Sequence, residues 1–150
     1  TTRKAINGII VEDIDNCLVR LAHCCVPLPG DDITGFITRG NGVSVHKADC
    51  KNIINTPEER RIRVSWAGKI SEYFAATLCI SAVNRYDLAV DITTVLAGMR
   101  VLMHSINTSS QSDGTVKIYV KVDVHDIEHL DSVAKRMKKI TNVIDVYRTT

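Results

Sequence analysis

Apolar and polar residues alternate without a break in the stretch VKIYVKVDV, from Val116 to Val124. This period of two is the pattern of a β-strand with one buried face and one solvated face. Such a strand belongs to a sheet that packs against other elements on one side only. The pattern therefore requires the surrounding sequence to supply neighbouring strands and the helices that cover one face of the sheet.

The residues on either side supply those elements. The mostly apolar run FAATLCISAV predicts a buried strand, Gly98 is placed to cap the end of the first helix, and Asp126 is placed to cap the start of the second. The order matches the ferredoxin-like βαββαβ fold, an antiparallel sheet with both helices on one face. The expected elements are strand 74–83, helix 87–98, strand 101–107, strand 116–124, helix 127–140 and strand 144–146.

The first part of the chain has a different character. Its three prolines all precede Gly68, and none follows. We expect two domains, 1–68 and 69–150, in an α+β chain whose first domain is a small β-rich module. A module of this size commonly needs a metal or a partner as a staple. Its expected elements are strands 8–11, 17–22, 33–38 and 43–46, a turn at 39–42, a short helix to Ile54 capped by Asp49, and one closing strand, 61–66.

Composition excludes several classes of protein. No apolar run approaches the roughly 18 residues of a membrane span, and the N-terminal residues lack the pattern of a secretory signal, so we expect a cytoplasmic protein that does not enter a membrane. Five cysteines, an odd number at irregular positions, favour reduced thiols or a metal over a disulfide framework. The net charge of +2 is too small to indicate nucleic-acid binding by itself, so any RNA contact requires a local patch.

The segment HCCVPLPGDD places two cysteines side by side before a Pro-x-Pro-Gly turn. His46 and Cys50 follow four positions apart, a spacing that puts both on one face of a helical turn, so Cys24, Cys25, His46 and Cys50 are candidate zinc ligands. Two observations argue against zinc. The usual C-x2-4-C spacing is absent, and neighbouring side chains on an extended backbone point to opposite faces, so adjacent cysteines would not both reach one ion.

Three other interpretations of the cysteine pair stay open. The first is that these thiols simply pack like small apolar residues. The second is a Cys24–Cys25 disulfide, which is strained because adjacent Cα atoms lie about 3.8 Å apart, below the roughly 4.4 Å minimum usual for disulfides. The third is a cysteine nucleophile with His23 or His46 as its base, although no oxyanion-hole motif accompanies it.

The run HCCVPLPGDDITGFITRGNGVSVHKADC, from His23 to Cys50, resembles the signature of RelA/SpoT-family (p)ppGpp synthetase/hydrolases, or GTP pyrophosphokinases, of the stringent response. In that family the segment belongs to a zinc-finger-like or ribosome-intersubunit domain, and an ACT domain with the βαββαβ order follows. The resemblance implies that this chain is the C-terminal regulatory region of a longer enzyme, with hydrolase and synthetase domains before Thr1.

The function implied by this resemblance is regulation. The chain shows no paired-His/Asp phosphohydrolase motif and no Gly-rich phosphate loop, so we expect it to be no enzyme by itself. The resemblance implies contacts with the ribosome and with tRNA that control the catalytic domains. Because phosphate contacts favour cationic and polar side chains, the candidates for RNA binding are Arg20, Arg39, His46 and Lys47.

The resemblance also implies an alternative, in which the ACT domain senses an amino acid, such as a branched-chain one, and acts as an allosteric regulator. The candidate ligand-binding residues lie between its first strand and first helix: Asn84, Arg85, Asp87 and Leu88. Asp87 stands where the family pattern has glycine, and a carboxylate there is expected to cap the helix and to compete with a ligand carboxylate. ACT domains often pair, and the open sheet face carries Lys117 and Tyr119, so we expect a homodimer formed through this domain.

Overall fold

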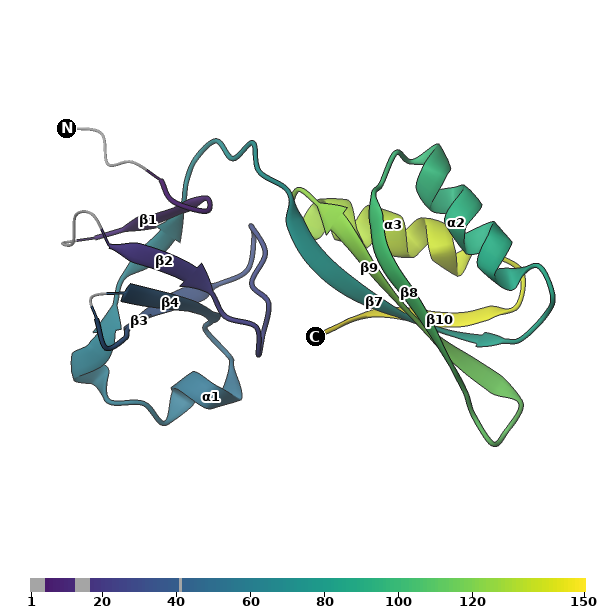
Figure 1. Ribbon diagram of the computed structural model, residues 1–150, viewed down its shortest axis with the longest axis horizontal. Helices are drawn as coiled ribbons and strands as arrows, with labels where there is room; N and C mark the ends of the chain where they lie inside the picture. The colour runs from purple at the N-terminus through teal and green to yellow at the C-terminus, as the bar shows by residue number, and fades with distance from the viewer. Residues whose placement is uncertain (1–4, 13–16, 41) are drawn as a thin grey trace. The chain divides into compact units, whose positions relative to one another are not determined.

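The computed structural model describes residues 5–12, 17–40 and 42–150 (Figure 1). The chain divides into two compact units, residues 1–72 with Thr150 and residues 73–149. Neither unit contains, among the described residues, a helix that has both the length and the apolar character needed to cross a bilayer. The mixture of helices and sheets expected from the sequence is confirmed.

The second unit is a four-stranded sheet with two helices. Its strands are all antiparallel and lie in the order β10-β7-β9-β8. In Figure 1 both helices lie on the same side of this sheet. The elements, in chain order, are β7 (Phe74–Val83), α2 (Leu88–Gly98), β8 (Met103–Ser110), β9 (Thr115–Val124), α3 (Ile127–Lys138) and β10 (Val143–Thr149).

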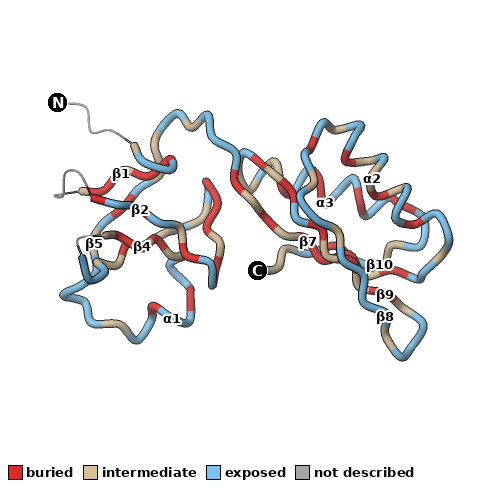
Figure 2. Tube along the Cα trace, in the orientation of Figure 1, coloured by how far each residue is buried: buried red, intermediate tan, exposed pale blue. Residues whose placement is uncertain are grey.

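The alternation in β9 fixes which side of this sheet is covered. All five of its apolar residues from Val116 to Val124 are at most 2% exposed, and the residues between them are less buried (Figure 2). On α3, Leu130, Val133 and Met137 form the buried stripe that packs on this face. Burying each of these side chains contributes about 1.5–3 kcal/mol, which makes the covered face the main source of stability in this unit.

The two helices of this unit begin and end differently from one another. Asp126 caps α3 as expected, because its Oδ1 atom accepts a hydrogen bond of 2.8 Å from the His129 N–H. The prediction that Gly98 caps the end of α2 is wrong. Gly98 is the last helical residue, and Arg100 takes the left-handed conformation, with φ of 56°. The Val101 N–H then bonds to the Leu96 carbonyl, and Val101 is 7% exposed, so core packing selects the end point rather than glycine.

The first unit contains two sheets and a short helix. The larger sheet has the order β2-β4-β3-β5, in which β2 and β4 run parallel and the other pairs are antiparallel. The smaller sheet pairs β1 with β6. The elements are β1 (Ile9–Val11), β2 (Leu18–Leu21), β3 (Ile33–Ile37), β4 (Gly42–Lys47), α1 (Lys51–Ile54), η1 (Glu58–Arg60), β5 (Arg61–Ile62) and β6 (Val64–Trp66).

Two hydrophobic clusters form the core of this unit. One joins the sheets through residues such as Val11, Val43 and Val45, and the other contains Cys25, Cys50 and Ile53. Gly35 in β3 is closely covered by β5 and β6, since a Cβ atom there would lie 2.7 Å from Val64 Cγ1 and 2.9 Å from the Ile62 carbonyl oxygen. Only glycine fits this contact without displacing backbone.

Two local predictions in the first unit differ from the structure. The run RIRVSW does not form one strand, because Arg61–Ile62 pairs with β3 whereas Val64–Trp66 pairs with β1. The residue preceding α1 is Cys50, without a side-chain cap, rather than Asp49, whose carboxylate lies 3.9 Å from Lys47 Nζ. Asn41, in the expected turn, lies outside the described residues.

Candidate functional site

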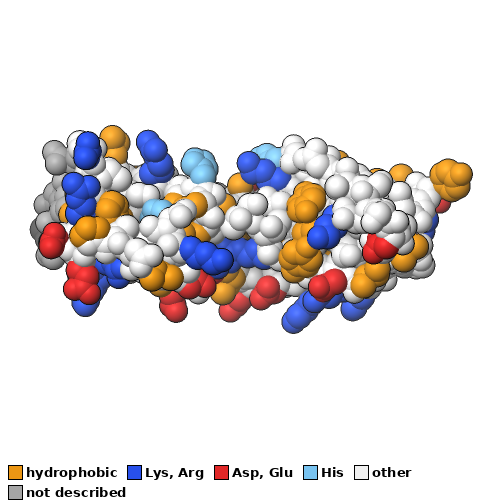
Figure 3. All heavy atoms as spheres, turned by 90° about the horizontal axis from the view of Figure 1, so that it is seen from below, with side chains coloured by type: hydrophobic (Ala, Val, Ile, Leu, Met, Phe, Trp, Pro, Cys, Tyr) orange, Lys and Arg blue, Asp and Glu red, His pale blue; other side chains and the backbone are white. Residues whose placement is uncertain are grey.

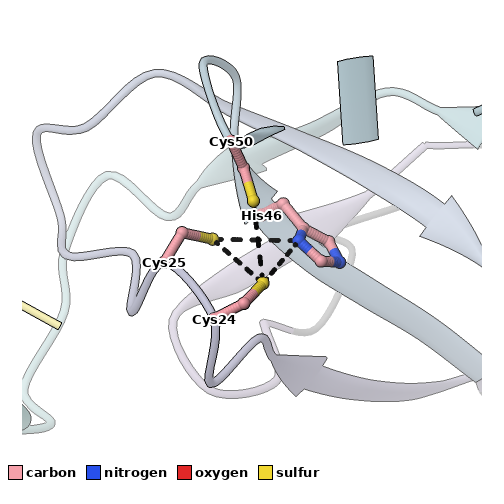
Figure 4. A group of neighbouring side chains, drawn as sticks. All are labelled: Cys24, Cys25, His46 and Cys50. Carbon is pink, nitrogen blue, oxygen red and sulfur yellow. Dashed lines mark hydrogen bonds between the residues drawn. The ribbon is translucent and has the colours of Figure 1, made fainter. Parts of the chain in front are cut away.

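Four side chains of the first unit point toward one another: Cys24, Cys25, His46 and Cys50 (Figure 4). Their donor atoms all lie within 4.8 Å of one another. The Cys24 Sγ atom lies 3.4 Å from His46 Nδ1, 3.6 Å from Cys50 Sγ and 3.9 Å from Cys25 Sγ. In a tetrahedral zinc site with Zn–S bonds of about 2.3 Å, sulfur atoms lie about 3.8 Å apart, so these separations suit one such ion.

The backbone after β2 explains how adjacent cysteines reach the same centre. The Ala22 N–H extends the pairing with β4 by donating to the Val45 carbonyl, and the Val26 N–H then turns back to the Ala22 carbonyl at 3.1 Å. Val26 has φ of 47°, in the left-handed region. Because the chain turns here instead of running extended, neighbouring side chains are not forced to opposite faces.

His46 and Cys50 arrive from different elements. His46 lies in β4, and Cys50 lies after a turn in which its N–H donates to the Lys47 carbonyl at 3.0 Å. The two therefore converge through a strand and a turn rather than on one helical turn. Ser44 precedes His46 by two residues, and its Oγ atom lies 3.1 Å from His46 Nε2. This contact orients the ring so that Nδ1 faces the thiols.

The surroundings of the cluster shift the pKa values of its members in different directions. Burial raises the pKa of Cys25 to about 12, although its sulfur accepts a hydrogen bond from the Lys47 N–H at 3.3 Å. Burial opposes ionisation of Cys24 as well, but hydrogen bonds from Asn52 and Cys50 outweigh it and lower the pKa of that thiol. Burial lowers the pKa of His46. Zinc prefers neutral imidazole together with thiolates, so binding of an ion here would release the proton that Cys25 otherwise retains.

The remaining cysteines lie elsewhere. Cys17 belongs to the core between the two sheets, and Cys79 is fully buried in β7 of the second unit. All five cysteines are free in this structure. Asn52, next to Cys24, and Ser44, next to His46, were not named from the sequence; the two-residue spacing of Ser44 and His46 on a strand is the one signal that pointed to the serine.

The basic candidates separate into two places. Arg20 in β2 and Arg39 after β3 line one hollow of about 330 Å³, together with Leu18, Thr38 and Ser44. Leu18 is 80% exposed there. Lys47 lies at the end of β4 beside Asp49, and both ring nitrogens of His46 have close neighbours in the first unit. On the face drawn in Figure 3, basic side chains are interspersed with acidic ones, so charge gathers only locally.

The loop before α2 is held by its own contacts. The Arg85 guanidinium donates to the Asp91 carboxylate at 2.5 Å and to the Thr141 carbonyl at 3.2 Å. The Asn84 side-chain oxygen accepts from the Arg85 N–H, and Leu88 is 1% exposed. Asp87 precedes α2 but makes no side-chain hydrogen bond to it, contrary to the expected cap.

Comparison with known families finds a matching domain family for each unit. Residues 71–148 match the ACT domain and residues 9–67 match the RelA/SpoT RIS domain. The chain therefore belongs to the ACT-domain family. Its RIS domain followed by an ACT domain corresponds to the C-terminal regulatory region of RelA/SpoT proteins, as the signature from His23 to Cys50 predicted.

Two named relatives agree with this assignment. The chain is 37% identical to a GTP pyrophosphokinase of Streptomyces coelicolor and 36% identical to a bifunctional (p)ppGpp synthase/hydrolase RelA of Mycobacterium tuberculosis, each over 95% of its own length. It spans only 17% and 20% of those two proteins. A solved ACT domain from a GTP pyrophosphokinase of Chlorobium tepidum is 19% identical with a TM-score of 0.46, and the match covers 52% of this chain and all of that one.

Proposed function

We propose that this chain is the regulatory region of a (p)ppGpp synthetase/hydrolase and that its first unit contacts the ribosome and tRNA. Arg20 and Arg39 carry the proposal, because residues from two different parts of the chain line the same hollow within the RIS-matching segment. By this proposal the chain performs no catalysis itself, and it controls catalytic domains of a longer protein in the cytoplasm.

The hollow offers the chemistry that an RNA backbone requires. Two guanidinium groups suit adjacent phosphates, because each can donate several hydrogen bonds in one plane. The hydroxyl groups of Thr38 and Ser44 add neutral partners for phosphate or ribose oxygens. Leu18 presents apolar surface at the same place, which suits the edge of a ribose or a base. Lys47 extends the proposed contact from a second position.

The four-donor cluster is connected to this hollow through β4. We assign Cys24, Cys25, Cys50 and His46 to a structural zinc ion in a zinc-finger-like module. His46 and Ser44 lie in β4, which pairs with β2, so the same strand carries a ligand and one wall of the hollow. An ion bound there would stabilise the segment between β2 and β3, because it would join Cys24 and Cys25 to His46 and Cys50.

Co-sedimentation with ribosomes at increasing salt tests the RNA contact. The wild-type chain is expected to pellet with ribosomes at low salt and to dissociate as salt rises. The double variant Arg20→Ala/Arg39→Ala is expected to bind more weakly, with a salt slope smaller by about one for each lost phosphate contact. Arg39→Ala with Lys47→Ala tests the second position. Arg60→Ala/Arg63→Ala removes the same charge from elsewhere in the unit and is the matched control.

Unchanged ribosome binding in both double variants, with the control also unchanged, would remove these residues from the proposal. Equal weakening in the control would mean that net charge, and not the hollow, attracts the RNA. Circular dichroism of each variant verifies that the fold is retained.

The ACT unit supports a second proposal, that a branched-chain amino acid binds near Asn84–Leu88 and that the chain dimerises through this domain. The family match supports it, whereas the internal contacts of Arg85 compete with a ligand carboxylate. Calorimetric titration with each amino acid is expected to give saturable heat for an effector, and Arg85→Ala is expected to abolish it. Heats that stay flat for every amino acid rule out effector binding, and a light-scattering mass of one chain at high concentration rules out the dimer.

A further inference from the structure

The three thiols of the cluster differ in their access to solvent. Cys24 is exposed, whereas Cys25 and Cys50 are 7% and 8% exposed. A small oxidant that diffuses to the first unit therefore meets the Cys24 sulfur first. Reactivity toward peroxide depends on this access as well as on the thiol itself. Cys24 is the entry point for any oxidation of this cluster.

The geometry also selects the partner of Cys24. The Cys50 sulfur lies 3.6 Å away and comes from a distant part of the chain, whereas the Cys25 sulfur lies 3.9 Å away on the adjacent residue. Every described peptide bond is trans, so the Cα atoms of adjacent residues are about 3.8 Å apart, shorter than an unstrained disulfide allows. The Cys25 sulfur is also held by the Lys47 N–H.

We propose that Cys24 and Cys50 form an oxidisable pair, which hydrogen peroxide converts into a disulfide when the cluster holds no metal. In the first step the Cys24 sulfur attacks one peroxide oxygen, the O–O bond breaks, and Cys24 becomes a sulfenic acid with release of water. In the second step the Cys50 thiol attacks that sulfur, and a second water leaves as the S–S bond forms. Two thiols are oxidised and one peroxide is reduced to two waters.

Metal and disulfide are alternative staples for the same segment. A Cys24–Cys50 bond removes two of the four donors, so an ion held by the full set cannot remain bound. The bond links the turn after β2 to the residue before α1, as the metal would. The first unit thus has a reduced, metal-bound state and an oxidised, metal-free state. This inference depends on the thiol geometry and stands apart from the proposed contact with RNA.

Peptide mapping of the whole chain tests the pair directly. Protein treated with a chelator and then with peroxide is alkylated and digested with trypsin without reduction. The expected product joins residues 21–39 to residues 48–51 and contains one alkylated cysteine, and its mass shows the loss of two hydrogen atoms. Cys25→Ser is expected to retain the crosslink, and Cys24→Ser and Cys50→Ser are expected to lose it. Cys17 and Cys79 stay alkylated and serve as internal controls.

A disulfide confined to residues 21–39, a Cys24 that accumulates as sulfinic acid, or a chain that stays fully reduced would each overturn the proposal. Excess zinc during the peroxide treatment is expected to slow crosslinking at least about tenfold. If zinc has no effect but the crosslink forms, the oxidisable pair stands and the metal assignment fails. Loss of ribosome binding in Arg20→Ala/Arg39→Ala with unchanged crosslinking separates this proposal from the one on RNA.

Discussion

The Nδ1 atom of His46 lies 3.4 Å from the Cys24 sulfur, although 22 residues separate them in sequence. The parallel pairing of β2 with β4 produces this contact, because it brings the end of β2 beside the end of β4. The His46 side chain of β4 thus lies at the thiols, while Ser44, two residues earlier in the same strand, lines the hollow. Stability of the cluster and shape of the hollow are therefore expected to change together.

Removal of one ligand is expected to destabilise the first unit selectively. In zinc-loaded protein, His46→Ala should lower the thermal midpoint of this unit by about 10 °C or more, because metal binding and folding are coupled. Trp66 is the single tryptophan and lies in this unit, so its fluorescence follows the transition. His23→Ala, at an exposed position beside the cysteines, is the control and should leave the midpoint unchanged. Equal shifts in the two variants would contradict the assignment.

Acid is expected to weaken the same unit. Burial lowers the pKa of His46 below its ordinary 6.5, so the unfolded chain takes up this proton at a higher pH than the folded chain does. Unfolding is then favoured as pH falls below about 6.5, and loss of the metal acts in the same direction because its ligands must be deprotonated. Urea titrations followed by Trp66 should show a steeper loss in wild type than in His46→Ala. Parallel curves would contradict the prediction.

The close approach at Gly35 predicts a sharp difference between two glycines. Gly35→Ala is expected to cost about 1–3 kcal/mol, because the new methyl group meets Val64, Ile62 and the Ile62 backbone. Gly68→Ala is the matched control, since a Cβ atom there has no heavy-atom neighbour within 4 Å. Urea denaturation monitored by Trp66 measures both. A Gly35→Ala variant as stable as Gly68→Ala would show that the sheets separate easily.

The helix starts of the second unit predict another matched pair. Asp126→Ala is expected to destabilise this unit by about 1 kcal/mol, because it leaves the His129 N–H without its cap. Asp87→Ala is expected to cost much less, since Asp87 makes no side-chain hydrogen bond to α2. Helical circular dichroism during urea unfolding measures this unit, whose two helices are the longest described. The opposite ranking would mean that Asp87 is the more important cap.

The fold of the second unit could be predicted from the sequence because apolar residues recur at regular spacings in its strands and helices. The alternation from Val116 to Val124 specifies a buried face, and the stripe on α3 specifies a helix that covers it, so local pattern and tertiary packing agree. The end of α2 could not be predicted in the same way. Burial of Val101 places the left-handed residue at Arg100, and no local signal distinguishes this from an end at Gly98.

The first unit was harder to predict because its geometry depends on long-range pairing. Arg61–Ile62 and Val64–Trp66 pair with different sheets because different strands lie beside them. The apolar pattern of RIRVSW would be the same if these residues formed one continuous strand. The turn that lets the adjacent Cys24 and Cys25 side chains face the same centre uses a positive φ at Val26. A β-branched residue rarely adopts this conformation, so the sequence does not predict it. The candidate ligands were named from residue type and from a helical spacing of His46 and Cys50 that the structure does not use, so their convergence could be seen only in the fold.

Metal content shows whether Cys24, Cys25, His46 and Cys50 act together as one zinc centre. Elemental analysis of protein purified without added metal is expected to find close to one zinc per chain in wild type and a large loss in Cys50→Ser. Less than roughly a tenth of an equivalent in the reduced wild-type chain would contradict this assignment.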